Sequence, residues 1–464
     1  MRTLLLFTRD LRVHDHPALH DAARVGEVVP LFVLDDRMLA VSPNRARFLM
    51  ESLADLRDAL ERRGSRLMVR RGGAARTAVR VAREAGCDAL AVTADHSRTA
   101  TRREAELGAA CRGAGIRLRV APGHAVVEPG VVTPSGRDHY SVFTPYHRAW
   151  LGAGRRPFLP APRAIRWPDG LDPAPGRLPA ARHTDSKDLP AGGGETAGRK
   201  VLASWIRSGL DGYAEGHDDL AGDRTSRLSP YLRFGCVSAN EVAAGALDRG
   251  TGAAGEAFVR QLCWRDFFLQ LLAAEPDLPR RSLRRGPHVD PPLDPDEAFE
   301  RWAAGQTGVP LVDAGMRQLA GEGWMHNRAR LVTGGFLTKH LGVWWRRGYE
   351  HFFRLLVDGD VANNAGNWQW VAGTAVDTRP NRRLNPVRQA RRFDPAGEYV
   401  RRFVGELADA PDHLVFEPWR DPAFLRSSGY PEPILPANDL GGQGRAYVPV
   451  HSAIGAWLGI PPRS

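Results

Sequence analysis

The stretch D-G-D-V-A-N-N-A-G-N-W-Q-W, from Asp358 to Trp370, gathers acids, amides and two tryptophans within thirteen residues. Acids and amides this close together supply several fixed hydrogen-bond partners, as a polar heterocycle needs. The tryptophans suit stacking or electron transfer beside such a ring. A polar loop followed by tryptophans of the hydrophobic core would have the same composition. In isolation the stretch leaves both interpretations open.

The chain has 464 residues, of which 43% are hydrophobic and 25% are charged. These values are typical of a globular protein with two or three domains and large buried cores. The formal net charge of +11 and the pI of about 10.0 indicate a polyanionic partner. Nucleic acid is the first candidate for that partner. A coding bias toward Arg would raise the charge without any partner.

Cysteine usage and hydropathy favour a reduced, cytoplasmic setting. The four cysteines include no C-x-x-C pair, so we expect no metal cluster. Cys87 and Cys263 fall in apolar surroundings and are predicted to be buried. No hydrophobic run is long enough to cross a membrane, and the N-terminal L-L-L-F run is too short for a secretory signal.

The first part of the chain alternates short apolar runs with helical patterns. The runs, which we expect to be strands, lie at residues 3–7, 28–34, 66–69, 89–92 and 116–120. Between them, residues 45–63 and 76–85 repeat apolar side chains at helical spacing. This alternation predicts an α/β, Rossmann-like domain with a parallel sheet covered on both faces. The G-x-G-x-x-G fingerprint of dinucleotide binding is absent after the first strand.

The rest of the chain divides into a linker and a helical part. Residues from about 150 to 198 are rich in Pro, Gly and Arg and read as a long surface linker. From about residue 199 the patterns are helical, and ten of the twelve tryptophans lie at or beyond position 205. We therefore expect an α/β domain over 1–130, a linker over 131–198 and an all-α domain over 199–464.

Four further segments of the chain contain groups of polar, charged or aromatic residues that can be compared with known motifs. T-S-R-L-S (Thr225 to Ser229) combines hydroxyl groups with a cation, which suits a pyrophosphate but also a capped helix start. The others are W-R-D-F-F (264–268), G-W-M-H-N-R-A-R (323–330) and T-R-D-L-R-V-H-D-H-P-A-L (8–19).

With these segments in this order, the chain resembles the DNA photolyase and cryptochrome family over nearly its whole length. The resemblance implies an N-terminal antenna domain and a C-terminal FAD-binding domain. It also implies light-driven repair of cyclobutane pyrimidine dimers in double-stranded DNA, by electron transfer from excited reduced FAD to a flipped-out dimer. We expect a monomer.

The resemblance places FAD on a set of residues from the helical domain. Asn364 matches the amide that faces the reactive ring nitrogen of the flavin, and Arg330 matches an arginine that pairs with Asp358. The residues expected to bind FAD are Tyr213, Thr225, Ser226, Arg227, Leu228, Ser229, Arg330, Asp358, Gly359, Asp360 and Asn364.

A second set is expected to meet damaged DNA. Trp264 and Trp370 match tryptophans that line the dimer cavity, and Arg382 matches a phosphate-contacting arginine, with Arg383 as the alternative. The residues expected to contact the lesion or the DNA are Gln261, Trp264, Asn327, Arg328, Trp370, Arg382 and Gln389.

Two departures from the family pattern leave the substrate open. Gln261 stands where dimer-repairing members have a glutamate, and Leu331 where they often have methionine. An amide supplies neither the charge nor the proton of a carboxyl group. A cryptochrome-like photoreceptor and a (6-4) photolyase therefore remain alternatives, although His326-Asn327 is not the histidine pair of (6-4) chemistry. A nucleic-acid-binding protein without cofactor is the third alternative.

The electron relay and the antenna are incomplete by family standards. Trp368 and Trp345 match the inner and middle tryptophans of the relay, and with Asn364 and Gln261 they form the expected catalytic set. The outer tryptophan is missing near Pro292, which leaves two alternatives: slow photoreduction, or an exit through another aromatic residue such as Trp302 or Trp344. Ala100-Thr101 replaces the Asn-Glu pair of folate-binding members, so a deazaflavin antenna is favoured over folate, with an empty or different antenna site as the alternative.

Overall fold

The computed structural model describes residues 1–172, 176–179, 184, 186, 189, 192–249, 252–284, 295–375, 382–437 and 440. The chain forms two compact units, each assembled from several segments. Unit 1 comprises Met1–Glu215, Arg224–Pro279 and Phe353–Gly366, and unit 2 comprises Gly216–Asp223, Arg280–Phe352 and Asn367–Ser464. No helix of the described residues is long and apolar enough to span a membrane.

Unit 1 contains a parallel sheet of five strands in the order β3-β2-β1-β4-β5. The strands are β1 (Arg2–Phe7), β2 (Glu27–Leu34), β3 (Met68–Arg71), β4 (Ala89–Thr93) and β5 (Arg117–Ala121). Strands β1, β2 and β4 are almost wholly buried, as unbroken apolar runs between two helical layers should be. The expected strands are confirmed to within two residues.

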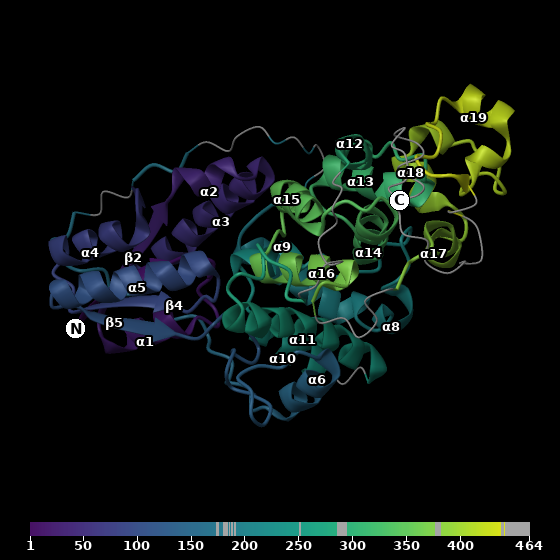
Figure 1. Ribbon diagram of the computed structural model, residues 1–464. Helices are drawn as coiled ribbons and strands as arrows, with labels where there is room; N and C mark the ends of the chain where they lie inside the picture. Colours follow the sequence, from purple (N-terminus) through teal and green to yellow (C-terminus); the bar gives the residue numbers. More distant parts are fainter. Residues whose placement is uncertain are drawn as a thin grey trace, which may run out of the picture. The chain divides into compact units, whose positions relative to one another are not determined.

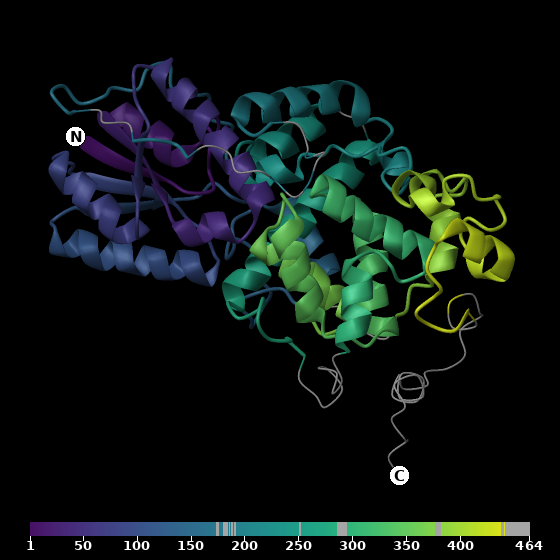
Figure 2. The same cartoon turned by 90° about the horizontal axis from the view of Figure 1, so that it is seen from above.

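Helices cover both faces of this sheet (Figure 1). They are α1 (Pro17–Val25), α2 (Asp36–Ala40), α3 (Pro43–Glu61), α4 (Ala74–Glu84) and α5 (Arg98–Gly113). α4 and α5 lie side by side on one face (Figure 2), where they bury Leu4, Leu6, Val29 and Leu31. α1 lies against the opposite face. The α/β class and the parallel sheet are therefore confirmed.

Beyond the sheet, all the secondary structure of the described residues is helical. The helices are α6 (Phe143–Gly152), α7 (Glu195–Ser204), α8 (Tyr213–Gly216), α9 (Ser229–Phe234), α10 (Ala239–Asp248), α11 (Ala253–Ala274), α12 (Asp296–Ala303), α13 (Pro310–Glu322), α14 (Asn327–Gly335), α15 (Trp345–Leu355), α16 (Val361–Ala372), α17 (Pro386–Phe393), α18 (Glu398–Phe403) and α19 (Pro422–Ser428). The expectation of an all-α second part is confirmed for these residues.

The segment expected to be a surface linker contains helix α6 and part of a core. Tyr146 and Trp150 of α6 are 1% and 0% exposed, and Ile165 is 1% exposed. The abundance of Pro, Gly and Arg around them suggested solvent exposure. Large aromatic side chains bury 150–250 Å² each, so two of them suffice to draw a short helix into the core. Part of this segment thus differs from the surface linker that its composition indicates.

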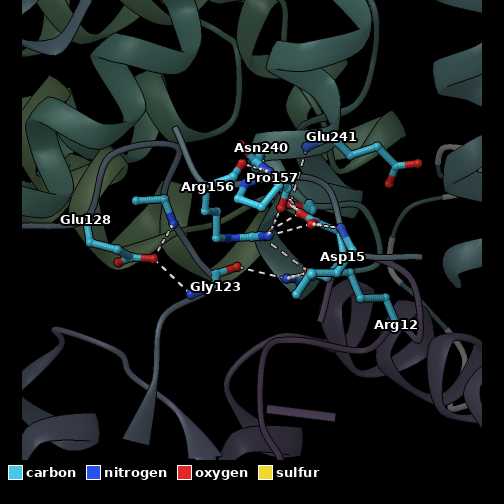
Figure 3. A network of polar contacts seen from close by, with 11 residues as sticks. Arg12, Asp15, Gly123, Glu128, Arg156, Pro157, Asn240 and Glu241 are labelled. Carbon is cyan, nitrogen blue, oxygen red and sulfur yellow. Dashed lines mark hydrogen bonds and ion pairs between the residues drawn. The ribbon is translucent and has the colours of Figure 1, made fainter. Parts of the chain in front are cut away.

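A buried polar network ties the loop after β1 to later parts of unit 1 (Figure 3). Asp15 is fully buried and accepts hydrogen bonds from both Nη atoms of Arg156, each at 2.5 Å, and one from the Ser238 hydroxyl. Arg12 donates to the carbonyl oxygen of Gly123 at 2.9 Å. These partners are far apart in sequence, so the network holds Gly123, Arg156 and the N-terminal end of α10 against the loop between β1 and α1.

Candidate functional site

The acids and amides of the 358–364 segment lie at the start of α16, in unit 1. Asp360 is 7% exposed, and its Oδ1 accepts the backbone N–H and the side-chain Nδ2–H of Asn363 at 2.9 and 2.8 Å. Its Oδ2 forms an ion pair with Nη2 of Arg9 at 2.6 Å. Asp358 and Asn364 are each 8% exposed. The segment is therefore a buried polar site anchored by an arginine from the N-terminal loop.

Positive charge surrounds this segment. Burial would raise the pKa of Asp360, but the guanidinium groups of Arg9, Arg233 and Arg265 outweigh burial and hold that pKa well below its usual range. Arg233 Nε also donates to the carbonyl oxygen of Gly359 at 2.7 Å. Asp360 is consequently ionised at neutral pH, with both of its oxygens engaged.

Gly359 has a packing reason to be glycine. A Cβ atom at this position would lie 2.6 Å from Nη1 of Arg45, which donates to the Leu356 carbonyl oxygen at 2.8 Å. The acids of this site were predictable from the sequence, whereas Arg9, Arg45 and Arg233 were not. The one available signal for Arg9 was its place in the T-R-D-L-R run at the end of the first strand.

The T-S-R-L-S segment, also in unit 1, turns tightly before α9. Arg227 has a positive φ of 49°, and the Ser226 hydroxyl accepts the Leu228 N–H at 3.3 Å. Thr225, Ser226 and Arg227 are partly exposed and Ser229 is exposed, while Leu228 is buried. Hydroxyls and a guanidinium that reach the surface together can bind an anion. A helix start and a phosphate site are compatible here.

Together these residues fit an FAD molecule by their chemistry. The buried acid and amide segment offers hydrogen-bond partners to a heterocycle, and the hydroxyl-rich turn offers partners to a pyrophosphate. Tyr213 is buried in unit 1 and packs edge-on against Trp205 and Phe258, with ring centroids 5.7 and 5.3 Å apart. These contacts do not test whether Tyr213 also contacts the cofactor, so that contact stays a prediction.

Two residues expected at the lesion lie on α11 in unit 1. Gln261 is exposed and Trp264 is half-buried. Trp264 stacks face-to-face on Phe143, with ring centroids 3.6 Å apart. Phe143 is not among the residues predicted for this site, and it lies in the segment expected to be a linker.

The residues around α14, in unit 2, are more firmly paired than expected. Arg328 forms a bidentate ion pair with Asp218, at 2.6 and 2.7 Å, and lies 4.6 Å from the ring centre of Phe393. Arg330 Nε donates to the Met325 carbonyl oxygen at 2.8 Å. The pairing of Arg330 with Asp358 stays a prediction.

His326 and its neighbours bear on the (6-4) alternative. His326 is 1% exposed and caps α14 by accepting the Arg328 N–H at 3.2 Å. Burial lowers the pKa of His326 to about 4, so its ring is neutral at pH 7. Asn327 is exposed and Leu331 is half-buried. A buried neutral histidine that serves as a helix cap is not poised to act as a general acid.

The relay tryptophans of unit 2 are buried and close to other aromatic rings. Trp368 is 4% exposed, and a Cβ atom on Gly348 of α15 would lie 2.2 Å from its ring. Trp345, one turn before Gly348, is 1% exposed and donates its Nε1–H to the Ser282 hydroxyl at 2.9 Å. The missing outer tryptophan was expected near Pro292, which lies outside the described residues.

The two alternative exits differ in exposure. Trp302 lies 6.1 Å from Trp368 between ring centroids but is 0% exposed. Trp344 lies 6.4 Å from Trp345 and is half-buried, so its ring reaches solvent. The remaining unit 2 residues expected to meet DNA also reach the surface. Arg382 and Arg383 are exposed, and Trp370 and Gln389 are half-buried.

A pocket of about 200 Å³ opens at the carboxyl ends of β1, β2 and β4, within unit 1. Its lining combines the apolar side chains of Leu6, Phe32 and Val33 with Asp95 and the cations of Arg9, Arg45, Arg103 and Arg233. The strand order reverses between β1 and β4, because β2 and β3 lie on one side of β1 while β4 and β5 lie on the other. Open parallel sheets bind ligands outside the carboxyl ends of their strands at such a reversal. The lining suits a flat, partly anionic molecule.

Comparison with known proteins matches both parts of the chain. Residues 3–164 match the family described as DNA photolyase, and residues 258–441 match the FAD binding domain of DNA photolyase. A deoxyribodipyrimidine photo-lyase from Streptomyces griseus is 50% identical, over 93% of this chain and 96% of that protein.

Two solved structures have the same fold. A class III photolyase from Agrobacterium tumefaciens is 32% identical, with a TM-score of 0.89, over 99% of this chain and 97% of the other. A photolyase from Sulfolobus tokodaii, solved with two FAD molecules, is 30% identical, with a TM-score of 0.80, over 95% of this chain and 97% of the other.

Proposed function

Because the chain belongs to the DNA photolyase and cryptochrome family, we propose that it is a deoxyribodipyrimidine photolyase that repairs cyclobutane pyrimidine dimers in DNA with light. The observation that carries this proposal is the buried 358–364 segment, whose acid Asp360 is held ionised by Arg9 beside the amides Asn363 and Asn364. A segment of this chemistry is suited to a flavin that changes its redox state.

We assign the binding of FAD to the two polar segments of unit 1. The side chains of Thr225, Ser226 and Arg227 would hold the pyrophosphate, while Asp358 and Asn364 would meet the ring system and its linker. When bound and reduced, FAD supplies light absorption and the electron for repair. Arg9 and Arg233 keep the segment in place and offset its negative charge.

The dimer must leave the double helix before it can be repaired, as for other enzymes that act on bases. We assign its recognition to Gln261 and Trp264 of α11 and to Trp370. Contact with the DNA backbone is assigned to Asn327, Arg328, Arg382 and Gln389. The two carbon–carbon bonds that join one pyrimidine to the other break and the electron returns, so no reductant is consumed. We also propose that the protein acts as a monomer in the cytoplasm, where this substrate would be found.

We assign a second, light-gathering pigment to the pocket at the strand ends. Its four arginines and apolar walls suit a deazaflavin or a second flavin. Ala100 is buried and Thr101 is exposed on α5, so no Asn-Glu pair is present for folate. Pigment extraction from purified protein, followed by mass spectrometry, tests this assignment.

Repair of a thymine cyclobutane dimer in an oligonucleotide tests the main proposal. Purified protein is reduced chemically, illuminated with blue light and compared with a dark control. We expect restoration of the thymines in the light only. Retention of reduced FAD without repair would contradict the proposal. The (6-4) lesion, an alternative that Gln261 leaves open, would then be the next substrate to test. A photoreceptor function would follow if that lesion is not repaired either. A purified protein without FAD would support the cofactor-free alternative.

A further inference from the structure

Phe143 of α6 covers one face of the Trp264 indole in unit 1. The ring centroids lie 3.6 Å apart and the ring planes differ by 2°. Phe143 is 7% exposed, whereas Trp264 is half-buried. Because the face against Phe143 is closed to any ligand, the exposed part of the indole lies elsewhere on the ring.

This stack is not the arrangement that two aromatic rings adopt by preference. Isolated pairs favour offset or edge-to-face geometries with centroids roughly 4.5–7 Å apart. Phe267, by contrast, meets Trp264 edge-on at 5.7 Å and 90°. The close parallel stack of Phe143 and Trp264 therefore requires that the backbones on both sides hold the rings in place.

Hydrogen bonds on either side of Phe143 fix α6 against α11. Gln270 donates to the Tyr140 carbonyl oxygen at 2.8 Å and accepts the Tyr140 N–H at 3.0 Å. Asp266 Oδ2 accepts the indole N–H of Trp150 at 2.9 Å. Tyr140 precedes Phe143 and Trp150 follows it, so the helix that carries Phe143 is tied to α11 at both ends.

The same Oδ2 atom ties a third piece of chain to α11. It accepts the backbone N–H groups of Val126 and Val127 at 2.9 and 3.0 Å, and Asp266 is 1% exposed. Asp266 lies only two residues after Trp264 on α11. These bonds hold the backbone near Trp264, but the bonds themselves do not orient its indole. The indole contacts Phe267 and Phe268 of the same helix at centroid distances of 5.7 Å, and Phe143 of α6 stacks on its face at 3.6 Å.

Phe143 also belongs to a longer series of rings. His147 lies nearly parallel to it, with centroids 5.5 Å apart and planes 20° apart. Burial, and then the nearby charge of Arg260, lower the pKa of His147. The exposed Arg260 places its guanidinium 5.1 Å from the centre of the Phe143 ring. Phe143 thus stacks with two other rings, those of His147 and Trp264.

We propose that Phe143 is a positioning residue for lesion recognition, which holds Trp264 so that a flipped-out pyrimidine dimer stacks on the uncovered side of its indole. The proposal rests on the contact between Trp264 and the dimer in the function proposed above. Bases stack readily on aromatic side chains, and a ring that is already fixed loses less freedom on binding. Phe143 touches no reacting atom, so it acts on binding of the dimer and not on its cleavage.

The test compares DNA binding and repair in wild type, Phe143→Leu and Phe143→Tyr. Removal of a stacked aromatic partner should weaken binding of a dimer-containing oligonucleotide roughly three- to tenfold. Binding of the undamaged oligonucleotide and the repair yield of the saturated, reduced complex should stay within twofold of wild type. Phe143→Tyr should restore dimer affinity because it restores the flat ring. For a Leu variant that fails to fold, Phe143→Met carries the same expectation.

Phe403→Leu is the matched control. Phe403 pairs with Tyr399 at a centroid distance of 5.0 Å and has no part in the proposed function. Two results would overturn the proposal for Phe143 alone, provided that wild type repairs the dimer. One is a Phe143→Leu variant that binds the dimer as tightly as wild type does, and the other is an equal loss of dimer affinity in Phe403→Leu. A wild-type protein that neither prefers nor repairs the dimer would overturn the proposed function and this inference together.

Discussion

At the scale of single residues, Arg9 is the side chain whose importance was hardest to foresee. It pairs with Asp360 at 2.6 Å and approaches Asp95 at 3.5 Å, and it also lines the pocket at the strand ends. Both partners of the Arg9–Asp360 pair are largely buried, with side-chain exposures of 13% and 8%. Loss of Arg9 leaves Asp360 without its directly paired cation in the interior, where Arg233 and Arg265 remain the other nearby positive charges.

Arg9→Gln should therefore lower the free energy of unfolding by about 3 to 5 kcal/mol and weaken retention of FAD. Denaturant unfolding and the flavin absorbance that remains after dialysis measure the two effects. Arg71→Gln is the control, because Arg71 pairs with Asp36 on the surface, with exposures of 58% and 73%. Its loss should cost less than about 1 kcal/mol. Equal effects in both variants would contradict the role of Arg9.

Asp95 gives a pH dependence with a definite sign. Burial would raise the pKa of Asp95, but nearby positive charge, that of Arg9 above all, lowers it to about 2. The folded state therefore binds fewer protons than the unfolded state between pH 4 and pH 2. The stabilisation is present above about pH 4 and is lost as the pH falls toward 2, an effect of about 2 kcal/mol. The stability difference between wild type and Asp95→Asn should shrink across this window in urea unfolding at a series of pH values. A difference that stays constant would show that Asp95 is not held ionised by its neighbours.

At the scale of elements, the regular pieces were predictable and their partners were not. The strands were visible as apolar runs, because burial between two helical layers leaves little room for polar side chains. Helix α6 was missed because Pro, Gly and Arg around it suggested a solvent-exposed segment. The ion pair of Arg9 with Asp360 spans 351 residues. Periodicity is a local signal, and it contains nothing about a contact at that separation.

Helix α16 contains Trp368, the expected inner tryptophan of the electron relay. Trp368→Phe should abolish light-driven reduction of oxidised flavin, because phenylalanine is far harder to oxidise than tryptophan, while chemically reduced protein should still repair dimers. Absorbance of the flavin under blue light measures the first effect. Trp302→Phe is the control, since Trp302 contacts Trp368 but has no exposed surface through which to reach solvent. Normal photoreduction in Trp368→Phe would remove this residue from the relay.

At the scale of the whole molecule, the net charge of +11 is the main reason to expect DNA binding. Not every arginine contributes equally to it. Arg328 is already neutralised by the bidentate pair with Asp218, whereas Arg382 is exposed. A phosphate would have to compete with Asp218 for Arg328, and this competition could not be seen from residues 110 positions apart in sequence.

Arg382→Ala should therefore weaken binding to undamaged DNA and reduce the slope of log affinity against log salt by about one. Arg328→Ala should reduce that slope by clearly less, because its charge is compensated before DNA arrives. Binding titrations at several salt concentrations measure both slopes, and Asp218→Asn adds a check because it should raise the contribution of Arg328. A larger change of slope for Arg328→Ala than for Arg382→Ala would reverse the assignment.

Unit 1 is built from three separate segments of the chain, and this has a consequence for its folding during synthesis. Its third segment, Phe353–Gly366, follows the long middle segment of unit 2 along the chain. Arg9 leaves the ribosome early, but Asp360 is added 351 residues later, which at common bacterial and eukaryotic rates means roughly 20 to 70 s of synthesis. Arg45 likewise waits for the carbonyl oxygen of Leu356. During that interval Arg9 lacks Asp360 and Arg45 lacks the Leu356 carbonyl oxygen. Unit 1 therefore reaches its final form only after most of the polypeptide has been translated.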